Sequence, residues 1–321
     1  MKHLLSALIL AIGLFAAQSV HAGTVPGTSC KTFPDDTWWH ADISGLPKHP
    51  RSNAWIAHMS PTSKLHPDFG PSFGDLPGNM PYGIPITVVG PNHAKLPVQF
   101  QYDDESDNVR YPLGPDTKVE GGQYQSGDRH TVIVDRGTCR LYETWATGRR
   151  NARWIAGSGA VWNLAGYTLR PDGFTSADAA GLPILPLLLR LDEVKANTID
   201  HAIRFTAETT DKRYVWPARH EAGSVNNQNY PPMGARFRLK ASYIIKPSLR
   251  ADTKRVLAAM KTYGLVLADN GSDWYFQGTS EPGWPNGLLD ELKQIPANAF
   301  EAVDTSSLMI NPNSMKVRAQ P

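Results

Sequence analysis

The stretch Asp128–Ala146 constrains the fold more than any other part of this sequence, because it predicts a β-hairpin with a carboxylate inside an apolar face. His130–Val134 is rich in β-branched residues, and Arg140–Trp145 alternates between polar and apolar residues, which is typical of strands. The residues between them, Asp-Arg-Gly-Thr at 135–138, are typical of a turn. The two strands should therefore pair with each other.

The second strand of this hairpin carries an unusual set of side chains. Side chains alternate between the faces of a strand, so Leu141, Glu143 and Trp145 share one face. A carboxylate between a leucine and a tryptophan is costly to bury unless it is used or satisfied. If a two-residue turn joins the strands, His130 lies opposite Glu143, whereas a loop one residue longer breaks this pairing.

The first 22 residues predict a cleaved export signal. The basic Lys2 precedes an apolar run, Leu4–Ala17, and the small residues up to Ala22 fit a cleavage site. The run is too short to span a bilayer, and no later segment is long and apolar enough. We therefore expect a secreted or periplasmic mature chain, cleaved near Ala22, with no membrane partner.

The composition argues against one class of partner and predicts one covalent bond. The chain has 32 basic and 30 acidic residues, and loss of Lys2 leaves 31 against 30, a net charge of +1. A protein that binds nucleic acid through electrostatics needs a strongly basic face, so we expect no nucleic-acid partner. The two cysteines, Cys30 and Cys139, both lie in the exported part, which predicts a disulfide between them.

Strand patterns outnumber helix patterns along the rest of the chain. A capped apolar stripe predicts a helix over Leu249–Tyr263, and weaker patterns predict short helices around Trp55 and Leu288. Asn-Gly between two apolar runs predicts a second β-hairpin over residues 265–276. Proline and glycine are frequent, at 26 and 27 residues, which suits a loop-rich exported domain better than a helical bundle.

These patterns predict a mostly β fold. At least eight strands stand against two or three short helices, and no repeat or linker divides the chain. We therefore expect a single β-sandwich or jelly-roll-like domain over residues 23–321, in which residues from about 305 form a loose tail.

Five segments of the sequence resemble a group of secreted bacterial proteins to which no activity is assigned. They are DRHTVIVDRGTCRLYETW, GFTSADAAGLPILP, RYVWPARH, PPMGARFRLKASY and GLVLADNGSDWY. The resemblance extends from about Phe33 to Asp304. It implies export and a single domain, and it transfers no catalytic residue.

Aromatic residues beside ionisable ones indicate a polysaccharide or cell-wall glycan as the partner. Sugar rings stack on tryptophan through their C–H faces, and their hydroxyls are recognised by carboxylates, amides and guanidinium groups. Several of the nine tryptophans lie next to such polar residues. The residues expected to bind substrate are Trp145, Trp216, Arg219, His220, Asp273 and Trp274.

Hydrolysis of a glycosidic bond generally requires two carboxyl groups, one protonated and one ionised. Glu143 and Asp269 are the first candidates for this pair. A salt bridge would explain Glu143 without catalysis, and turn formation would explain Asp269. Asp178 and Glu208 rank second, and helix capping is the favoured explanation of Asp178.

Two other functions remain open. A lyase acting on a uronate polymer needs a His or Tyr base and a cation beside the substrate carboxylate, which His130 with Arg129, or Arg219 with His220, supplies. A non-catalytic glycan- or wall-binding protein needs only the aromatic residues. No zinc-binding or phosphate-binding motif occurs, so we expect no metal and no cofactor. The first expectation is a glycoside hydrolase, with Glu143, Asp269 and His130 as the catalytic candidates.

Overall fold

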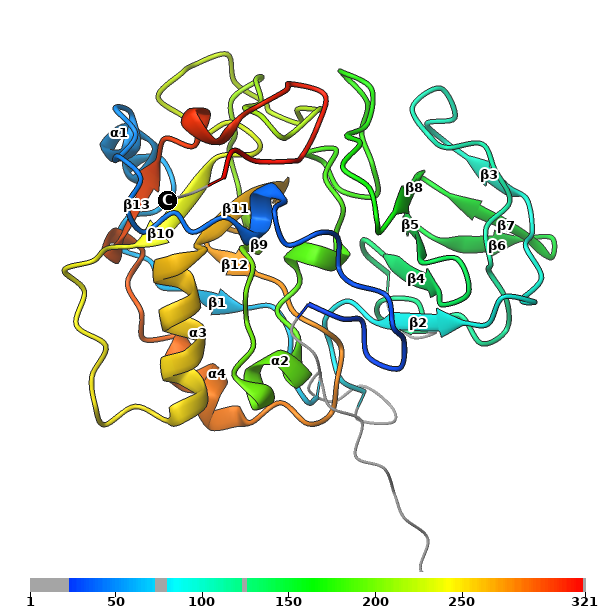
Figure 1. Ribbon diagram of the computed structural model, residues 1–321, viewed down its shortest axis with the longest axis horizontal. Coiled ribbons are helices and arrows are strands. Elements are labelled where there is room, and N and C mark those ends of the chain that lie inside the picture. Colours follow the sequence, from blue (N-terminus) through cyan, green and yellow to red (C-terminus); the bar gives the residue numbers. More distant parts are fainter. Residues whose placement is uncertain (1–22, 73–79, 123–125, 320–321) are drawn as a thin grey trace, which may run out of the picture.

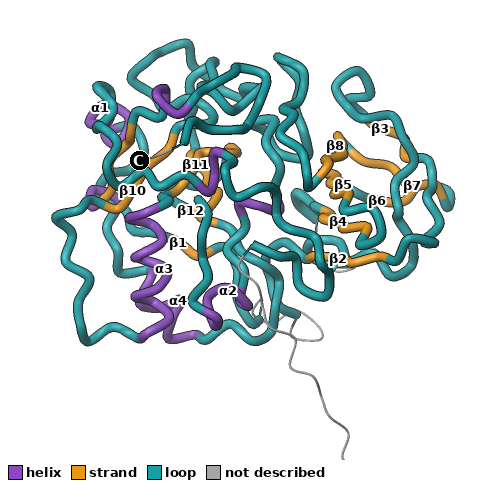
Figure 2. The backbone as a smooth tube through the Cα atoms, viewed as in Figure 1, coloured by secondary structure: helices purple, strands orange, loops and turns teal. Residues whose placement is uncertain are grey.

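The computed structural model describes residues 23–72, 80–122 and 126–319, so the predicted signal at 1–22 lies outside the described residues. The fold is mostly β, as predicted, with 27% of residues in strands and 15% in helices, and its curled sheets are consistent with a β-sandwich or jelly-roll-like fold. Short strands and long loops alternate along the backbone (Figure 2). No helix of the described part is long and apolar enough to cross a membrane.

Three sheets make up the fold. In Figure 1, the four-stranded and three-stranded sheets lie on the right, and the six-stranded sheet lies on the left. The four-stranded sheet contains, in spatial order, β2 (Ile86–Val89), β4 (Thr131–Asp135), β5 (Arg140–Trp145) and β8 (Ser158–Asn163). The three-stranded sheet contains β3 (Val98–Phe100), β7 (Arg153–Ala156) and β6 (Gly148–Arg150). The six-stranded sheet contains β1 (His66–Pro67), β12 (Tyr275–Phe276), β9 (Ile203–Ala207), β11 (Leu265–Asn270), β10 (Arg236–Leu239) and β13 (Phe300–Val303).

The four-stranded sheet is buried on both faces. Val132 and Leu141 point into the main core that this sheet shares with the six-stranded sheet. Ile133 and Tyr142 point the other way and pack with Trp154 of the three-stranded sheet in a second, smaller core. This arrangement explains why polar residues of β4 and β5 are also buried and must find partners inside the protein.

The central hairpin forms, but with a longer turn than the one that would pair His130 with Glu143. Val132 is the residue opposite Glu143, and the last pair is Asp135 with Arg140. The turn therefore has four residues, 136–139, and the suggested pairing is wrong. The Asp135 carboxylate accepts a hydrogen bond from the Gly137 N–H at 3.0 Å, which stabilises this longer turn.

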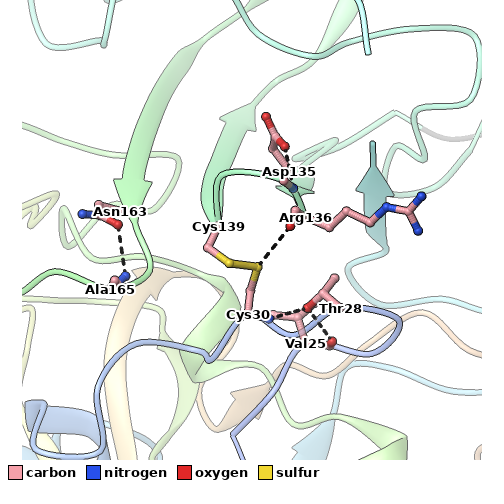
Figure 3. Close-up of a disulfide and its surroundings, with 9 residues drawn as sticks. Val25, Thr28, Cys30, Asp135, Arg136, Cys139, Asn163 and Ala165 are labelled. Carbon is pink, nitrogen blue, oxygen red and sulfur yellow. Dashed lines mark hydrogen bonds between the residues drawn. A yellow bond between two sulfur atoms is a disulfide. The ribbon is translucent and has the colours of Figure 1, made fainter. Parts of the chain in front are cut away.

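The predicted disulfide is present (Figure 3). Cys30 lies in the N-terminal segment and Cys139 lies at the end of the hairpin turn, with their Cα atoms 5.4 Å apart. The bond joins residues 109 positions apart. It holds the N-terminal segment against the four-stranded sheet, beside the end of β4.

The prediction of a second hairpin over residues 265–276 is wrong. β9 lies between β11 and β12 and pairs parallel with the first and antiparallel with the second. The loop after Asn270 crosses the end of β9 because its residues are held there: the Trp274 N–H donates to the Thr206 carbonyl, and the Trp274 side chain is fully buried. A local Asn-Gly signal is overridden by this burial.

Four α-helices occur among the described residues: α1 (Ser52–Ala57), α2 (Leu191–Ala196), α3 (Ala251–Thr262) and α4 (Asn286–Leu292). The helices α1, α3 and α4 match the three predicted ones, and α2 was not predicted. The helices α1, α3 and α4 pack against the six-stranded sheet. The helix that Asp178 was expected to cap does not form, because residues 177–180 make an irregular turn.

The C-terminal segment is packed rather than loose over its described part. Met315 and Val317 are buried. Their N–H groups donate to the carbonyls of Tyr167 and Asp36. The segment therefore packs against the core as far as Val317.

Candidate functional site

A pocket of about 310 Å³ lies between the four-stranded and six-stranded sheets. Trp145 at the end of β5 and Ser158 at the start of β8 line one side of it, and Asp269 of β11 lines the other. Loops that contain Glu105, Asp178 and other residues complete its wall. The pocket is therefore assembled from parts of the chain that are far apart in sequence.

A β-bulge in β11 directs Asp269 toward this pocket. The register of β11 against β9 shifts by one residue between Leu267 and Asp269, so Asp269 pairs with Thr206. Thr206 lies on the same face of β9 as Arg204, because alternate residues of a strand share a face. Without the bulge, Asp269 would instead lie on the face of Phe205, in the hydrophobic core.

The extra residue of the bulge also positions Asp178. The Ala268 carbonyl accepts a hydrogen bond from the Ala180 N–H at 2.9 Å, which holds the 175–180 loop against β11. Asp178 lies in that loop and its side chain is 1% exposed. No helix follows it, so helix capping does not explain this residue. Its Oδ2 atom has no hydrogen-bond partner among the described residues.

Arg204 connects the two carboxylates. One guanidinium nitrogen of Arg204 lies 2.7 Å from Asp178 Oδ1 and 3.5 Å from Asp269 Oδ2. The other terminal nitrogen donates to Gln277 Oε1 at 2.8 Å. A fully buried arginine on a central strand thus orients two carboxyl groups toward the same pocket.

Burial raises the pKa of both carboxyl groups, and Arg204 opposes this effect. The pKa of Asp178 is raised because its charge is removed from water, although Arg204 stabilises the ionised form. Burial and the charge of Asp178 raise the pKa of Asp269 to about 7. Since Arg204 is closer to Asp178 than to Asp269, a proton shared by the pair is favoured on Asp269.

His130 lies behind the pocket and does not line it. It is 2% exposed, and its Nδ1 atom lies 2.6 Å from Glu120 Oε2, which also accepts the His130 backbone N–H at 3.1 Å. Burial opposes charging of this imidazole, but Glu120 outweighs it, so the pKa of His130 is raised. Burial likewise opposes ionisation of Glu120, and His130 outweighs it, so the pKa of Glu120 is lowered. The two residues therefore form a buried ion pair.

An aromatic wall borders the carboxylates. The rings of Trp145 and Tyr102 lie 6.3 Å apart at 33°, and Tyr102 is 43% exposed. Trp145 Nε1 donates to Asp128 Oδ1 at 3.2 Å. Gly157 lies against the Trp145 ring, where a Cβ atom would approach Cε3 to 2.1 Å. Gly157 thus leaves the space that the ring occupies.

Glu143 lies outside the pocket, although it was a first candidate for catalysis. It is fully buried, and its oxygens accept hydrogen bonds from the N–H groups of Ile184 and Leu185 and from Trp162 Nε1, at 2.8–3.1 Å. Burial raises the pKa of Glu143 to about 7, partly offset by these donors. The carboxylate binds the start of the short 3-10 helix η2 (Leu185–Leu187) to the four-stranded sheet.

Three further candidates, Trp216, Arg219 and His220, are close in sequence but diverge in space. His220 lines the pocket, and its Nδ1 atom contacts the Ala179 carbonyl at 2.8 Å. Trp216 and Arg219 instead hold the C-terminal segment. Trp216 Nε1 donates to the Ser314 carbonyl at 3.1 Å, and Arg219 donates to the Pro312 carbonyl at 3.0 Å.

Asp273 and Trp274 do not line the pocket either. The Asp273 carboxylate accepts hydrogen bonds from Ser60 Oγ at 2.7 Å and from the Glu208 N–H at 2.9 Å. Trp274 is fully buried, stacks on Phe205 and donates to the Met59 carbonyl. Both residues stabilise the loop that crosses β9.

Sequence reasoning ranked Asp178 low and missed several other residues of the site. Arg204 carried a usable signal, since it is a lone charge in the apolar run of β9, which requires a buried partner. The other pocket residues lie on loops and gave no such pattern. The missed residues are Tyr102, Glu105, Glu120, Asp128 and Arg204.

No group of three or more His, Cys, Asp and Glu side chains in the described part is arranged to hold a metal ion. No protein-family model, curated protein or solved structure matches this chain. The geometry of the pocket is therefore what supports a function.

Proposed function

We propose that this protein is a secreted glycoside hydrolase that acts on a polysaccharide, with Asp178 and Asp269 as its carboxyl pair. The observation that carries the proposal is that both carboxyl groups bind one nitrogen of Arg204 beside an aromatic wall. Asp178 takes the role first expected for Glu143, because the Glu143 carboxylate is already occupied by three N–H groups outside the pocket.

The environments of the two carboxyl groups assign different roles to them. Asp269, with a pKa of about 7, is protonated below neutral pH and is the general acid. Arg204 lies closer to Asp178 than to Asp269, so we assign the negative charge of the pair to Asp178, with its unpartnered Oδ2 as the nucleophile. Their two Arg204-bound oxygens can be no farther apart than the sum of 2.7 and 3.5 Å. This limit applies to Oδ1 and not to the nucleophilic Oδ2, so it shows that the two carboxyl groups are neighbours; we propose the retaining mechanism, which uses a close pair.

The reaction then has two balanced steps. Asp269 gives its proton to the glycosidic oxygen as the C–O bond breaks, while Asp178 Oδ2 bonds to the anomeric carbon and forms a glycosyl ester. Water next attacks the same carbon, Asp269 takes one proton from that water, and the ester bond to Asp178 breaks. Each step regenerates the protonation state that the next one needs.

The surroundings of the pocket support a polymeric substrate. A second depression, of about 180 Å³, is lined by Asp68, Glu120 and Asp128. Asp128 also lines the first pocket, so the two depressions adjoin. A chain of sugars can therefore extend past the carboxyl pair. The lyase alternative has less support, since no Lys or Arg is among the residues that line the main pocket to neutralise a uronate.

The test is a screen of neutral, amino and uronate polysaccharides with two readouts. New reducing ends indicate hydrolysis, and near-ultraviolet absorbance indicates an unsaturated lyase product. Asp178→Asn and Asp269→Asn should each lower the hydrolytic rate by at least about a hundredfold. Glu208→Gln, which changes an exposed carboxylate at the end of β9, should leave it unchanged.

Two further measurements distinguish the roles. Azide should restore turnover to Asp178→Gly and give a glycosyl azide, because a small anion can occupy the space of the missing nucleophile. The wild-type rate should fall above about pH 7, as Asp269 loses its proton. Full activity in both Asn variants with normal folding, or an unsaturated product, would overturn the proposal.

A further inference from the structure

The pocket that Asp178 and Asp269 line contains two further carboxylates. Glu105 and Asp128 line it in addition to Asp178 and Asp269, and no Lys or Arg lines it. The buried Arg204 binds Asp178 and Asp269, and His220 in the pocket wall lies 3.7 Å from Glu105. Asp128 is therefore the lining carboxylate that no cation pairs with among the described residues.

Asp128 is the carboxylate best placed to bind a charged group of the ligand. Its Oδ1 atom accepts the Trp145 indole N–H at 3.2 Å, and no other hydrogen bond or ion pair to its carboxylate occurs within the described residues. Glu105 is less free, because it accepts the Thr175 N–H at 3.0 Å and lies 3.7 Å from His220. A sugar ring stacked on Trp145 thus brings its substituents within reach of Asp128.

A second observation points to a ligand at this place. Asp178 is almost completely buried and lines the pocket, and its Oδ2 atom has no hydrogen-bond partner in the described part of the chain. A buried acceptor without a partner is costly, so it indicates that something else completes the site. The aromatic wall, Asp128 and Asp178 line the same pocket.

We propose that the pocket binds a sugar unit that carries a protonated amino group, so that the substrate is a glycan with free amino sugars. The inference rests on the proposed function and adds the substrate class to it. The ammonium group donates to Asp128 and lies against the face of Trp145, where both the carboxylate and the aromatic ring attract a cation. An N-acetylated unit has the same ring but lacks the charge, and a uronate unit is repelled.

The test compares binding of two matched ligands, a glucosamine oligosaccharide and the N-acetylated oligosaccharide of equal length. Binding is read from tryptophan fluorescence within seconds of mixing, at pH 6 and low salt. The wild type should bind the amino oligosaccharide roughly fivefold to tenfold more tightly, and added salt should weaken this preference because it screens an exposed charge pair. Asp128→Asn should reduce the preference to within about twofold.

Asp290→Asn is the matched control, because it removes an exposed carboxylate from α4, away from the pocket, and should leave the preference intact. Equal binding of both ligands by the wild type, or an undiminished preference in Asp128→Asn, would overturn the inference. Reducing ends are measured on the same two ligands. Amine-selective binding without hydrolysis would support the inference and refute the hydrolase, whereas hydrolysis of both ligands at equal efficiency would do the reverse.

Discussion

Replacing Glu143 by glutamine tests whether this carboxylate stabilises the fold or takes part in the chemistry. Its two oxygens accept hydrogen bonds only from N–H groups: those of Ile184 and Leu185 and the indole of Trp162. Glutamine has nearly the same shape, but one oxygen becomes an NH₂ group. Whichever oxygen is replaced, a buried N–H of the amide then faces an N–H of the protein.

The expected cost follows from this count. One hydrogen bond to a charged group is lost, and a buried donor is left without a partner, each of which costs about 1–3 kcal/mol. We therefore expect the free energy of unfolding of Glu143→Gln to fall by about 2–4 kcal/mol. For a chain of this size, that corresponds to a melting temperature lower by roughly 3–6 °C.

The assay is thermal unfolding followed by circular dichroism, combined with activity per folded molecule. Glu208→Gln is the control, since this exposed side chain should change the stability by no more than about 0.5 kcal/mol. Activity per folded molecule should stay at the wild-type value in both variants. An unchanged melting temperature together with a hundredfold loss of activity would show that Glu143 acts in the chemistry and that our assignment of Asp178 is mistaken.

Two further predictions concern the covalent link and the buried ion pair. Replacing Cys30 and Cys139 by serine should destabilise the protein by on the order of 4 kcal/mol in denaturant unfolding, because the bond closes a loop of 109 residues; two free thiols in the unreduced wild type, seen by mass spectrometry, would contradict the bond. Glu120→Gln should destabilise most near pH 5.5 and less near pH 8.5. The raised pKa of His130 contributes stability that is complete below about 6.5 and is lost as pH rises, and the lowered pKa of Glu120 contributes stability that is lost as pH falls below about 4.5. The loss should reach about 3 kcal/mol at pH 5.5, measured by urea unfolding, and an equal loss at both pH values would contradict the ion pair.

The sequence predicted the features that depend on neighbouring residues. The alternation in Arg140–Trp145 and the apolar stripe of Leu249–Tyr263 are local patterns, and both elements formed close to the expected bounds. The disulfide was predictable because Cys30 and Cys139 are the only two cysteines. In these cases no distant part of the chain competes with the local preference.

The features that failed depend on contacts between distant residues. The Asn270-Gly271 signal is genuine as a turn signal, but β9 is inserted between the two strands that it was expected to join. The sequence around Asp178 predicts a helix cap, but the 175–180 loop is held instead by a hydrogen bond from the Ala180 N–H to the Ala268 carbonyl. Neither the burial of β9 nor a hydrogen bond across about 90 positions leaves a periodic pattern in the sequence.

The bulge in β11 also makes the site sensitive to the length of the chain. Deleting Ala268 would return β11 to a regular register with Asp269 still opposite Thr206, but it would remove the carbonyl that holds Ala180 and the 175–180 loop. One deleted codon would thus release Asp178 from its place beside Asp269 while every ionisable residue remained in the sequence. A comparison of proteins of this kind by residue identity alone would count such a chain as intact, so the spacing between Leu267 and Asp269 is the feature to inspect.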